Sequence, residues 1–187
     1  MQSEYTSNDK IKLREILKLR RQHIDCRERR EIAATDNILP RLYGNVLVYV
    51  SMGSELSTKM LIDELMGREG VAVYVPLTKD GIITPVRLIK RASVADKLGN
   101  IDDSCYDKTD TATKIDCCVT PILGYNGNGH RIGYGKGCYD RLFSDGRVGI
   151  CNKIGLAFDC QKCEFDADKH DIALDICVTE SGIEVFS

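Results

Sequence analysis

The sequence contains no long hydrophobic run. Its longest apolar stretches, such as VLVYV at 46–50, are far shorter than the roughly 20 residues that span a membrane. The first ten residues, MQSEYTSNDK, lack the basic start and the apolar centre of a signal peptide. We therefore expect a cytoplasmic protein that has no membrane partner.

The sequence also lacks an excess of one charge. It has 26 basic and 28 acidic side chains, which give a formal net charge of −2. A balance this close to zero creates no overall field that would attract nucleic acid or an anionic surface. We expect a monomer that binds small molecules and no nucleic acid, and any anion must be held by a local cluster of cations.

A second Cys-x-x-Cys pair is missing as well. The chain has nine cysteines, but their number is odd and no secretion signal accompanies them, which favours reduced thiols over disulfides. The pair in CQKC at 160–163 has only His170 nearby, whereas a structural zinc ion needs four ligands. We expect no metal or redox role for the cysteines, and at least one of Cys117 and Cys118 should face a core.

What the chain does contain is a pattern of alternating helices and strands. Its 187 residues, 43% of them hydrophobic, suit one compact α/β domain over residues 1–187, without repeats or linkers. A basic helix is predicted from about residue 9, with Ser7, Asn8 and Asp9 as candidate caps, and a second helical stretch follows at 27–42. The first helix is indicated by four apolar residues at near-helical spacing, which are Leu13, Ile16, Leu17 and Leu19.

Short apolar runs predict a parallel sheet. A strand at 45–50, a capped helix at 57–70 and a strand at 71–76 that stops at Pro76 form a β-α-β unit, which places helices on the faces of a parallel sheet. The run at 82–87 contains Pro85 and is expected at a sheet edge, and the polar stretch 98–110 is expected to be a surface excursion. Further buried strands are predicted at 115–121, 153–158 and 175–180. These features predict a three-layer α/β/α fold with a mostly parallel, Rossmann-like sheet and N-terminal helices.

One segment, GHRIGYGKGCYDRLF at 129–143, combines glycines with positive charge. It lies between the strand that ends near 121 and a helix that starts near 137, which is where α/β sheets bind ligands. Alternate glycines let backbone N–H groups approach an anion, and a helix N-terminus adds about half a positive charge. The spacing matches neither the dinucleotide fingerprint nor the Walker loop. We predict a phosphate site of another kind, and a flexible surface loop is the alternative.

This segment resembles the signature of the 5-formyltetrahydrofolate cyclo-ligase family, also called 5,10-methenyltetrahydrofolate synthetases, whose pattern is approximately G-x-R-L-G-x-G-x-G-Y-Y-D-R. Other segments resemble the same family in the same order, and they are KIKLR at 10–14, YVSMGSELST at 49–58, GLAFDCQ at 155–161 and HDIALDICVTE at 170–180. The resemblance thus covers nearly the whole chain.

The resemblance implies an ATP-dependent ligase that requires magnesium. It converts 5-formyltetrahydrofolate to 5,10-methenyltetrahydrofolate, releases ADP and phosphate, and passes through a phosphorylated formyl group, an iminium phosphate. Two alternatives stay open. One is a homologue that binds ATP and folate without turnover, and the other is a small-molecule kinase.

The resemblance also implies roles for individual residues. Lys10 and Arg14 lie four positions apart on the first predicted helix, so both can reach ATP phosphates from one face. The implied ATP-binding residues are Lys10, Arg14, Arg131, Gly133, Tyr134, Gly135, Lys136, Gly137, Cys138 and Tyr139, among which Arg131, Lys136 and Tyr139 are the catalytic candidates. The implied folate-binding residues are Val50, Met52, Glu55, Tyr134, Gly135, Lys136, Gly137 and Cys138. Magnesium would be held by Asp140 and Asp175, since it needs only one or two carboxylates besides phosphate and water.

Some of these residues also have structural interpretations. Asp140 could only complement the dipole of its helix, and Glu55 could be an acid before a Ser57 cap. For His170, a place in a core or beside the site is favoured over catalysis. A solvated basic face is expected for Lys12, Lys18, Arg20 and Arg21.

The main departure from the family pattern is Cys138, which stands where the pattern has the first of two tyrosines. A structural substitution is favoured over a reactive thiolate at this position. Gln161 falls in a matched segment without an assigned role, and no function is assigned to residues 97–114.

Overall fold

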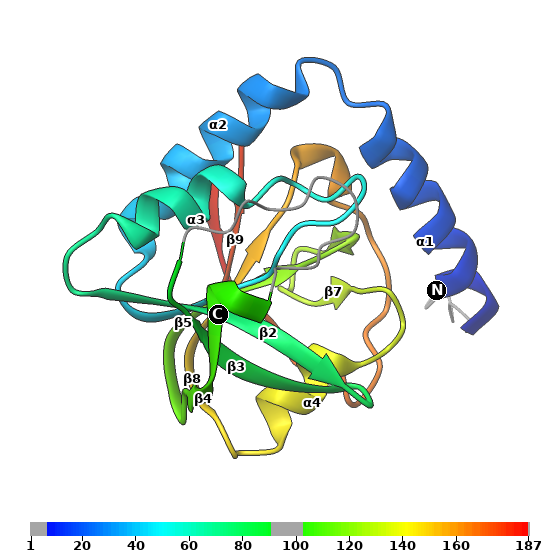
Figure 1. Cartoon of the computed structure of the whole chain (residues 1–187). Coiled ribbons are helices and arrows are strands. Elements are labelled where there is room, and N and C mark those ends of the chain that lie inside the picture. Colours follow the sequence, from blue (N-terminus) through cyan, green and yellow to red (C-terminus); the bar gives the residue numbers. More distant parts are fainter. Residues whose placement is uncertain (1–6, 91–102, 187) are drawn as a thin grey trace.

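The computed structural model describes residues 7–90 and 103–186, and a β-sheet forms its centre (Figure 1). Among these residues, eight strands form the sheet in the order β10-β9-β8-β5-β1-β2-β3-β4. The strands are β1 (Gly44–Val48), β2 (Val71–Lys79), β3 (Ile82–Leu88), β4 (Tyr106–Thr111), β5 (Lys114–Pro121), β8 (Gly149–Leu156), β9 (Ile176–Thr179) and β10 (Gly182–Val185). The five strands from β9 to β2 are parallel, and the outer pairs β10–β9, β2–β3 and β3–β4 are antiparallel. The predicted mostly parallel sheet is therefore confirmed.

Helices cover both faces of this sheet (Figure 1). The helices are α1 (Ser7–Gln22), α2 (Arg27–Ile38), α3 (Lys59–Met66) and α4 (Cys138–Ser144), with short 3-10 helices η1 (Leu39–Arg41), η2 (Asp103–Cys105) and η3 (Asp159–Gln161). Ile38 of α2 and Leu61 of α3 pack in the core on one face, and Leu142 of α4 packs in the core on the other. The three-layer α/β/α fold is thus as predicted. Within the described ranges, no helix has both the length and the apolar character to cross a membrane.

The strand β5 is buried on both sides. Cys117 belongs to the core under α2 and α3, whereas Cys118 belongs to the core under α4, and both are fully buried. Successive side chains of a strand point to opposite faces, so both adjacent cysteines act as small core residues. All nine cysteines lie among the described residues and carry free thiols.

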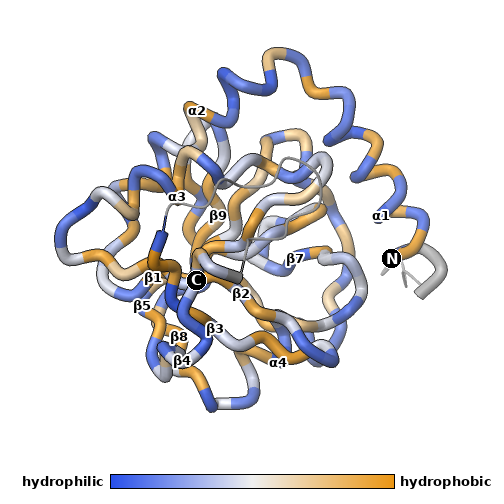
Figure 2. The backbone as a smooth tube through the Cα atoms, viewed as in Figure 1, coloured by the Kyte–Doolittle hydropathy of each residue, from blue (hydrophilic) through white to orange (hydrophobic). Residues whose placement is uncertain are grey.

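Only part of the apolar stripe predicted for α1 is buried in the structure. Leu17 is fully buried with Leu123 and Ile132, but Ile16 and Leu19 are 46% and 55% exposed. Only one side of α1 contacts the rest of the protein, and hydrophilic residues interrupt the apolar ones along it (Figure 2). The helix is already formed at Ser7, so the three cap candidates lie inside it.

The β2–β3 hairpin departs from the prediction. β2 does not stop at Pro76 but continues to Lys79, and β3 does not lie at the edge because β4 pairs with its outer side. Pro76 and Pro85 are register partners, so the two residues without N–H groups fall at one position of the ladder. The strand β4 forms in the stretch predicted as a surface excursion, although most of it is exposed, and residues 98–102 lie outside the described residues.

The other boundaries differ by a few residues. The second helical stretch ends as an α-helix at Ile38 and continues as η1 around Pro40. The helix α3 starts at Lys59 with Thr58, not Ser57, at its N-cap position. The strand β10 was not predicted, because its four residues are only partly buried and give a weak periodic signal.

Candidate active site

A cavity of about 870 Å³ opens at the carboxyl ends of the central strands. Tyr49 follows β1 and Pro121 ends β5, and both line the cavity. β1 and β5 are neighbours in the sheet. β2, which follows β1 in the chain, lies on one side of this pair, and β8, the next parallel strand after β5, lies on the other side. Ligands of parallel α/β sheets bind at such a switch of strand order, and the volume suits a small-molecule site.

The glycine-rich segment forms one wall of this cavity, and every residue from 131 to 140 lines it. The connection before α4 is not structureless, because β6 (Gly124–Tyr125) and β7 (Arg131–Ile132) pair as a short antiparallel ribbon. Gly135 and Gly137 have φ angles of 87° and 61°, which a residue with a side chain rarely adopts. The two glycines therefore allow a tight path of the backbone along the cavity wall.

The cations of this segment have different surroundings. Lys136 is exposed in the cavity wall. Arg141 does not line the cavity, because its Nη2 donates to the carbonyl of Gly81 at 2.9 Å and to that of Lys136 at 2.6 Å. Arg141 thereby ties the glycine-rich segment to the turn between β2 and β3.

Arg131 lines the cavity and is held in an ion pair with Asp140. Its side chain is 6% exposed, and its Nη2 lies 2.7 Å from Oδ1 of Asp140, while Nη1 donates to the carbonyl of Ile172 at 2.7 Å. The backbone N–H of Ile172 donates to the same Oδ1 of Asp140 at 3.3 Å. Arg131 therefore orients the carboxylate of Asp140, and within the described residues these bonds leave Oδ2 of Asp140 available.

The first helix supplies a second cationic wall. Lys10 and Arg14 both line the cavity, as their spacing on one helix face led us to expect. Nε of Arg14 donates to the carbonyl of Gly133 at 3.0 Å, which joins α1 to the glycine-rich segment. Nζ of Lys10 lies 2.6 Å from Oδ2 of Asp168 and 3.3 Å from Oδ2 of Asp171.

The structure does not bring Asp175 into the cavity. Its carboxylate accepts a bond from the backbone N–H of Lys153 at 2.6 Å and pairs with Nζ of Lys153 at 3.1 Å. Asp171, four residues earlier, lines the cavity together with Asp140. Asp168 of the same segment lines the cavity as well, so the path of the chain brings Asp168 and Asp171, and not Asp175, to the site.

The carboxylates of Asp140 and Asp171 suit a magnesium ion better than a transition metal. Among the residues that the structure describes, no three His, Cys, Asp or Glu side chains are grouped as a metal site. Magnesium needs fewer protein ligands, because it keeps several waters and takes others from substrate phosphates. Glu55, Asp140, Asp168 and Asp171 all line the cavity, and we take Asp140, which Arg131 orients, and Asp171 as the candidates for holding the ion.

Glu55 lies in the turn between β1 and α3 and is 6% exposed. Its Oε2 accepts the backbone N–H of Met52 at 2.7 Å, and its own N–H donates to the carbonyl of Met52 at 3.0 Å. Val50, Met52 and Glu55 all line the cavity, so the proposed folate residues are brought together. Glu55 does not act before a Ser57 cap, because α3 begins after Thr58.

Two tyrosines of the glycine-rich segment line the same cavity. Burial raises the pKa of Tyr134 to about 12, although its hydroxyl accepts a hydrogen bond from Arg21 at 2.7 Å. Burial also raises the pKa of Tyr139 well above its usual value, and no described residue bonds to its buried hydroxyl. Between them, Cys138 is half-buried, with its Sγ 3.8 Å from Nη2 of Arg141.

Sequence reasoning missed Arg21, which it assigned to a solvated basic face. Arg21 is 3% exposed, and its guanidinium donates to Oγ of Ser54 at 3.2 Å, the carbonyl of Ile122 at 3.1 Å and the hydroxyl of Tyr134 at 2.7 Å. Neighbouring cations of α1 carry the same local signal, so only the packing of the helix distinguishes Arg21.

The apolar wall formed by β2, β3 and β4 was also missed. It consists of Val75, Pro76, Leu77, Thr78, Ile83, Val86 and Tyr106. The apolar run of β2 was recognised as a strand, but no sequence signal shows that its end faces a cavity.

Two residues of the matched C-terminal segments lie outside the site. Gln161 is 1% exposed, and its amide bonds the backbone of Phe158 and Ile122. His170 is exposed, so the expected place in a core is wrong; it does not line the cavity itself, although Asp168 and Asp171 on either side of it do.

The sheet is mostly parallel, and the cavity at its switch of strand order is lined by cations and by a glycine-rich segment. These features define the class as an α/β protein with an anion-binding site. The particular family is given by its sequence model, which matches residues 6–180. The chain belongs to the 5-formyltetrahydrofolate cyclo-ligase family.

Individual relatives are more distant. A 5-formyltetrahydrofolate cyclo-ligase from Mycoplasma pneumoniae is 39% identical over 67 residues, which are 36% of this chain and only 40% of that protein. One from Escherichia coli (strain K12) is 28% identical over 144 residues, covering 74% of this chain and 79% of that protein. The solved structure of a 5,10-methenyltetrahydrofolate synthetase from Mycoplasma pneumoniae has a TM-score of 0.71 at 23% identity, with 92% and 99% of the two chains covered. This structural likeness supports the three-layer fold.

Proposed function

We propose that this protein is a 5-formyltetrahydrofolate cyclo-ligase, which uses ATP to form 5,10-methenyltetrahydrofolate and releases ADP and phosphate. The observation that carries the proposal is one cavity lined by Arg14 and Lys136 and also by the buried Glu55. Cations suit phosphate oxygens, and a carboxylate can accept hydrogen bonds from the N–H donors of a pterin. Membership of the family supports the same reaction.

The reaction needs ATP because the oxygen of an amide-like formyl group is a poor leaving group. In the first step, the formyl oxygen attacks the γ-phosphorus, the bond to the β–γ bridging oxygen breaks, and ADP leaves. In the second step, N10 attacks the formyl carbon of the iminium phosphate, the carbon–oxygen bond breaks, and phosphate leaves together with the proton that N10 loses. Such a reaction requires positioning and charge neutralisation more than covalent participation by the protein.

The cavity residues provide these two contributions. Lys136 would contact the transferred phosphoryl group, and the backbone N–H groups near Gly135 and Gly137 would contact its oxygens. Lys10 and Arg14 would hold the remaining phosphates from α1, which adjoins the glycine-rich segment at Gly133. The hydroxyl of Tyr139, which has no hydrogen-bond partner among the described residues, offers a buried donor to a substrate atom.

Because its guanidinium is paired with Asp140, we assign Arg131 a positioning role in place of the direct phosphate contact implied by the sequence. It positions Asp140, which with Asp171 would hold magnesium. When bound, magnesium would neutralise charge on the phosphate oxygens and so favour attack at phosphorus.

The test is an assay of purified protein with 5-formyltetrahydrofolate, ATP and magnesium, which monitors the near-ultraviolet absorbance of the methenyl product. We expect product formation and release of free phosphate. A phosphorylated folate would indicate a small-molecule kinase, and ATP binding without any turnover would indicate an impaired homologue. Either result would overturn the proposal.

A variant tests the phosphoryl role of Lys136. We expect Lys136→Ala to lower kcat by about 100-fold or more, because a charge at the transferred group is lost. Lys12→Ala is the matched control, since Lys12 is exposed on α1 and does not line the cavity. Equal rates for the two variants would remove Lys136 from the mechanism.

A further inference from the structure

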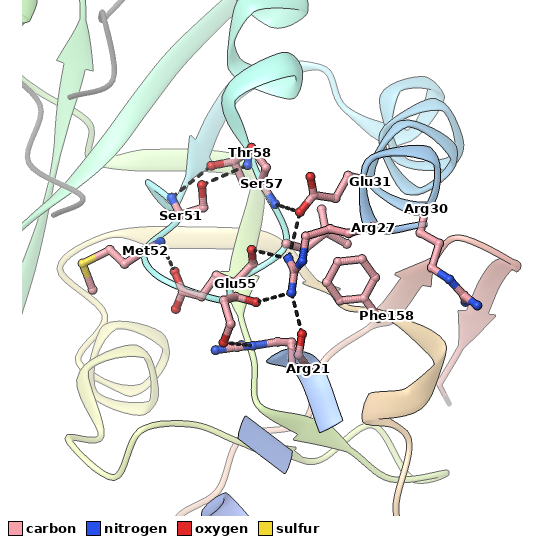
Figure 3. A network of polar contacts seen from close by, with 12 residues as sticks. Arg21, Arg27, Arg30, Glu31, Ser51, Met52, Glu55, Ser57, Thr58 and Phe158 are labelled. Atoms are coloured by element: carbon pink, nitrogen blue, oxygen red, sulfur yellow. Dashed lines mark hydrogen bonds and ion pairs between the residues drawn. The ribbon is translucent and has the colours of Figure 1, made fainter. Parts of the chain in front are cut away.

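Arg27 lies on α2 outside the main cavity, yet it holds the turn that carries Glu55 (Figure 3). Its Nη2 donates to the carbonyl of Ser54 at 3.2 Å, and its Nη1 donates to the carbonyl of Glu55 at 3.3 Å. These two carbonyls belong to the peptide groups on either side of the Glu55 Cα. A single guanidinium therefore fixes the backbone on both sides of the residue proposed to bind folate.

The guanidinium of Arg27 is itself held in place. Nη1 pairs with Oε1 of Glu31 at 3.0 Å, Nη2 donates to the carbonyl of Arg21 at 2.5 Å, and the group lies over the ring of Phe158 at 4.9 Å from its centre. Phe158 is fully buried, so the stacking surface is rigid. A planar fork that stacks and donates in several directions is a property of arginine that lysine cannot reproduce.

Glu31 extends the same support to the far end of the turn. The Oε1 atom that pairs with Arg27 also accepts the backbone N–H of Ser57 at 3.2 Å. The carboxylate of Glu55 is in turn oriented inside the turn by the N–H of Met52 (Figure 3). The direction of the Glu55 side chain thus depends on a backbone that α2 holds in place.

We infer that Arg27 is a positioning residue that sets the folate affinity through Glu55, an inference that rests on the proposed function. Arg27 and Glu31 line a separate, open hollow of about 520 Å³ behind the turn. Water can occupy this hollow when the arginine is shortened, so variants at Arg27 keep a solvated environment. Loss of Arg27 should loosen the turn and leave the fold intact.

The experiment compares steady-state constants for both substrates. We expect Arg27→Met to raise the KM for 5-formyltetrahydrofolate by about tenfold, because two charge-assisted bonds to the turn are lost, and to leave the KM for ATP unchanged. Arg27→Lys should restore part of the folate affinity, since one bond can re-form. The matched control is Arg30→Met, which removes a cation of the same helix that is 43% exposed and pairs with Glu180, and neither residue lines the cavity.

A double-mutant cycle tests whether Arg27 acts through Glu55. In a Glu55→Gln background, Arg27→Met should raise the folate KM by much less than in the wild type, because the orientation of the carboxylate no longer matters. A merely structural role would give the same factor in both backgrounds, or would raise both KM values together, and either result would overturn the inference.

The same measurements separate this inference from the proposed function. A wild-type protein without methenyl product refutes the proposed function and the inference with it. An active wild type whose Arg27→Met variant behaves like Arg30→Met refutes the inference alone.

Discussion

Arg21 should contribute measurably to the stability of the protein, although it looks like one of several surface cations. We consider the change Arg21→Met, which keeps most of the apolar stem and removes the guanidinium. The three lost bonds go to Ser54, Ile122 and Tyr134. A hydrogen bond to a charged group contributes about 1.5–3 kcal/mol, so a simple sum would be large.

The surroundings of the three acceptors reduce this sum. The carbonyl of Ile122 keeps a bond from Nε2 of Gln161 at 2.7 Å. Ser54 is half-buried and Tyr134 is 42% exposed, so water can replace the arginine at both hydroxyls. We therefore expect Arg21→Met to lower the free energy of unfolding by about 2–3 kcal/mol.

The measurement is urea unfolding followed by circular dichroism. With an m value of about 2 kcal/mol per molar urea, the midpoint should fall by about 1–1.5 M. Arg20→Met is the control, because Arg20 is the exposed neighbour on the same helix. Equal midpoints for the two variants would show that the contacts of Arg21 contribute nothing, and the argument from its burial would be wrong.

Two further predictions concern the ATP wall and the buried thiols. Lys10→Ala should raise the KM for ATP by about tenfold and leave the KM for folate unchanged, because a cation that would bind the ATP phosphates is lost. A raised KM for folate with an unchanged KM for ATP would contradict this role of Lys10. Burial raises the pKa of Cys118 from 9.0 to about 12, so between pH 9 and 12 the unfolded chain releases this proton while the folded protein keeps it. The free energy of unfolding should therefore be insensitive to this group below pH 9 and fall above it, by about 1.4 kcal/mol per pH unit. Urea unfolding from pH 7 to 10.5 measures this slope, and Cys118→Ala should reduce it; an unchanged slope in the variant would contradict the assignment.

The sequence alone indicated the central parallel strands and the glycine-rich segment that lines the cavity. Apolar runs such as 115–121 are buried on both faces, and a buried parallel strand needs only its own residues to be recognised. The glycine-rich segment could be located because its composition is local and its place after a buried strand is fixed by the chain order. The prolines misled the prediction, since Pro76 and Pro85 share one position of the hairpin and interrupt neither strand.

The tertiary structure decided which of several similar side chains face the interior or the cavity. Arg20 and Arg21 are adjacent cations, but only Arg21 faces the protein, because α1 contacts the body on one side. Asp171 and Asp175 are both acids of one segment, and only the path of the chain brings Asp171 to the cavity. Contacts between residues far apart in the chain depend on how the elements pack, and local sequence patterns do not record that packing.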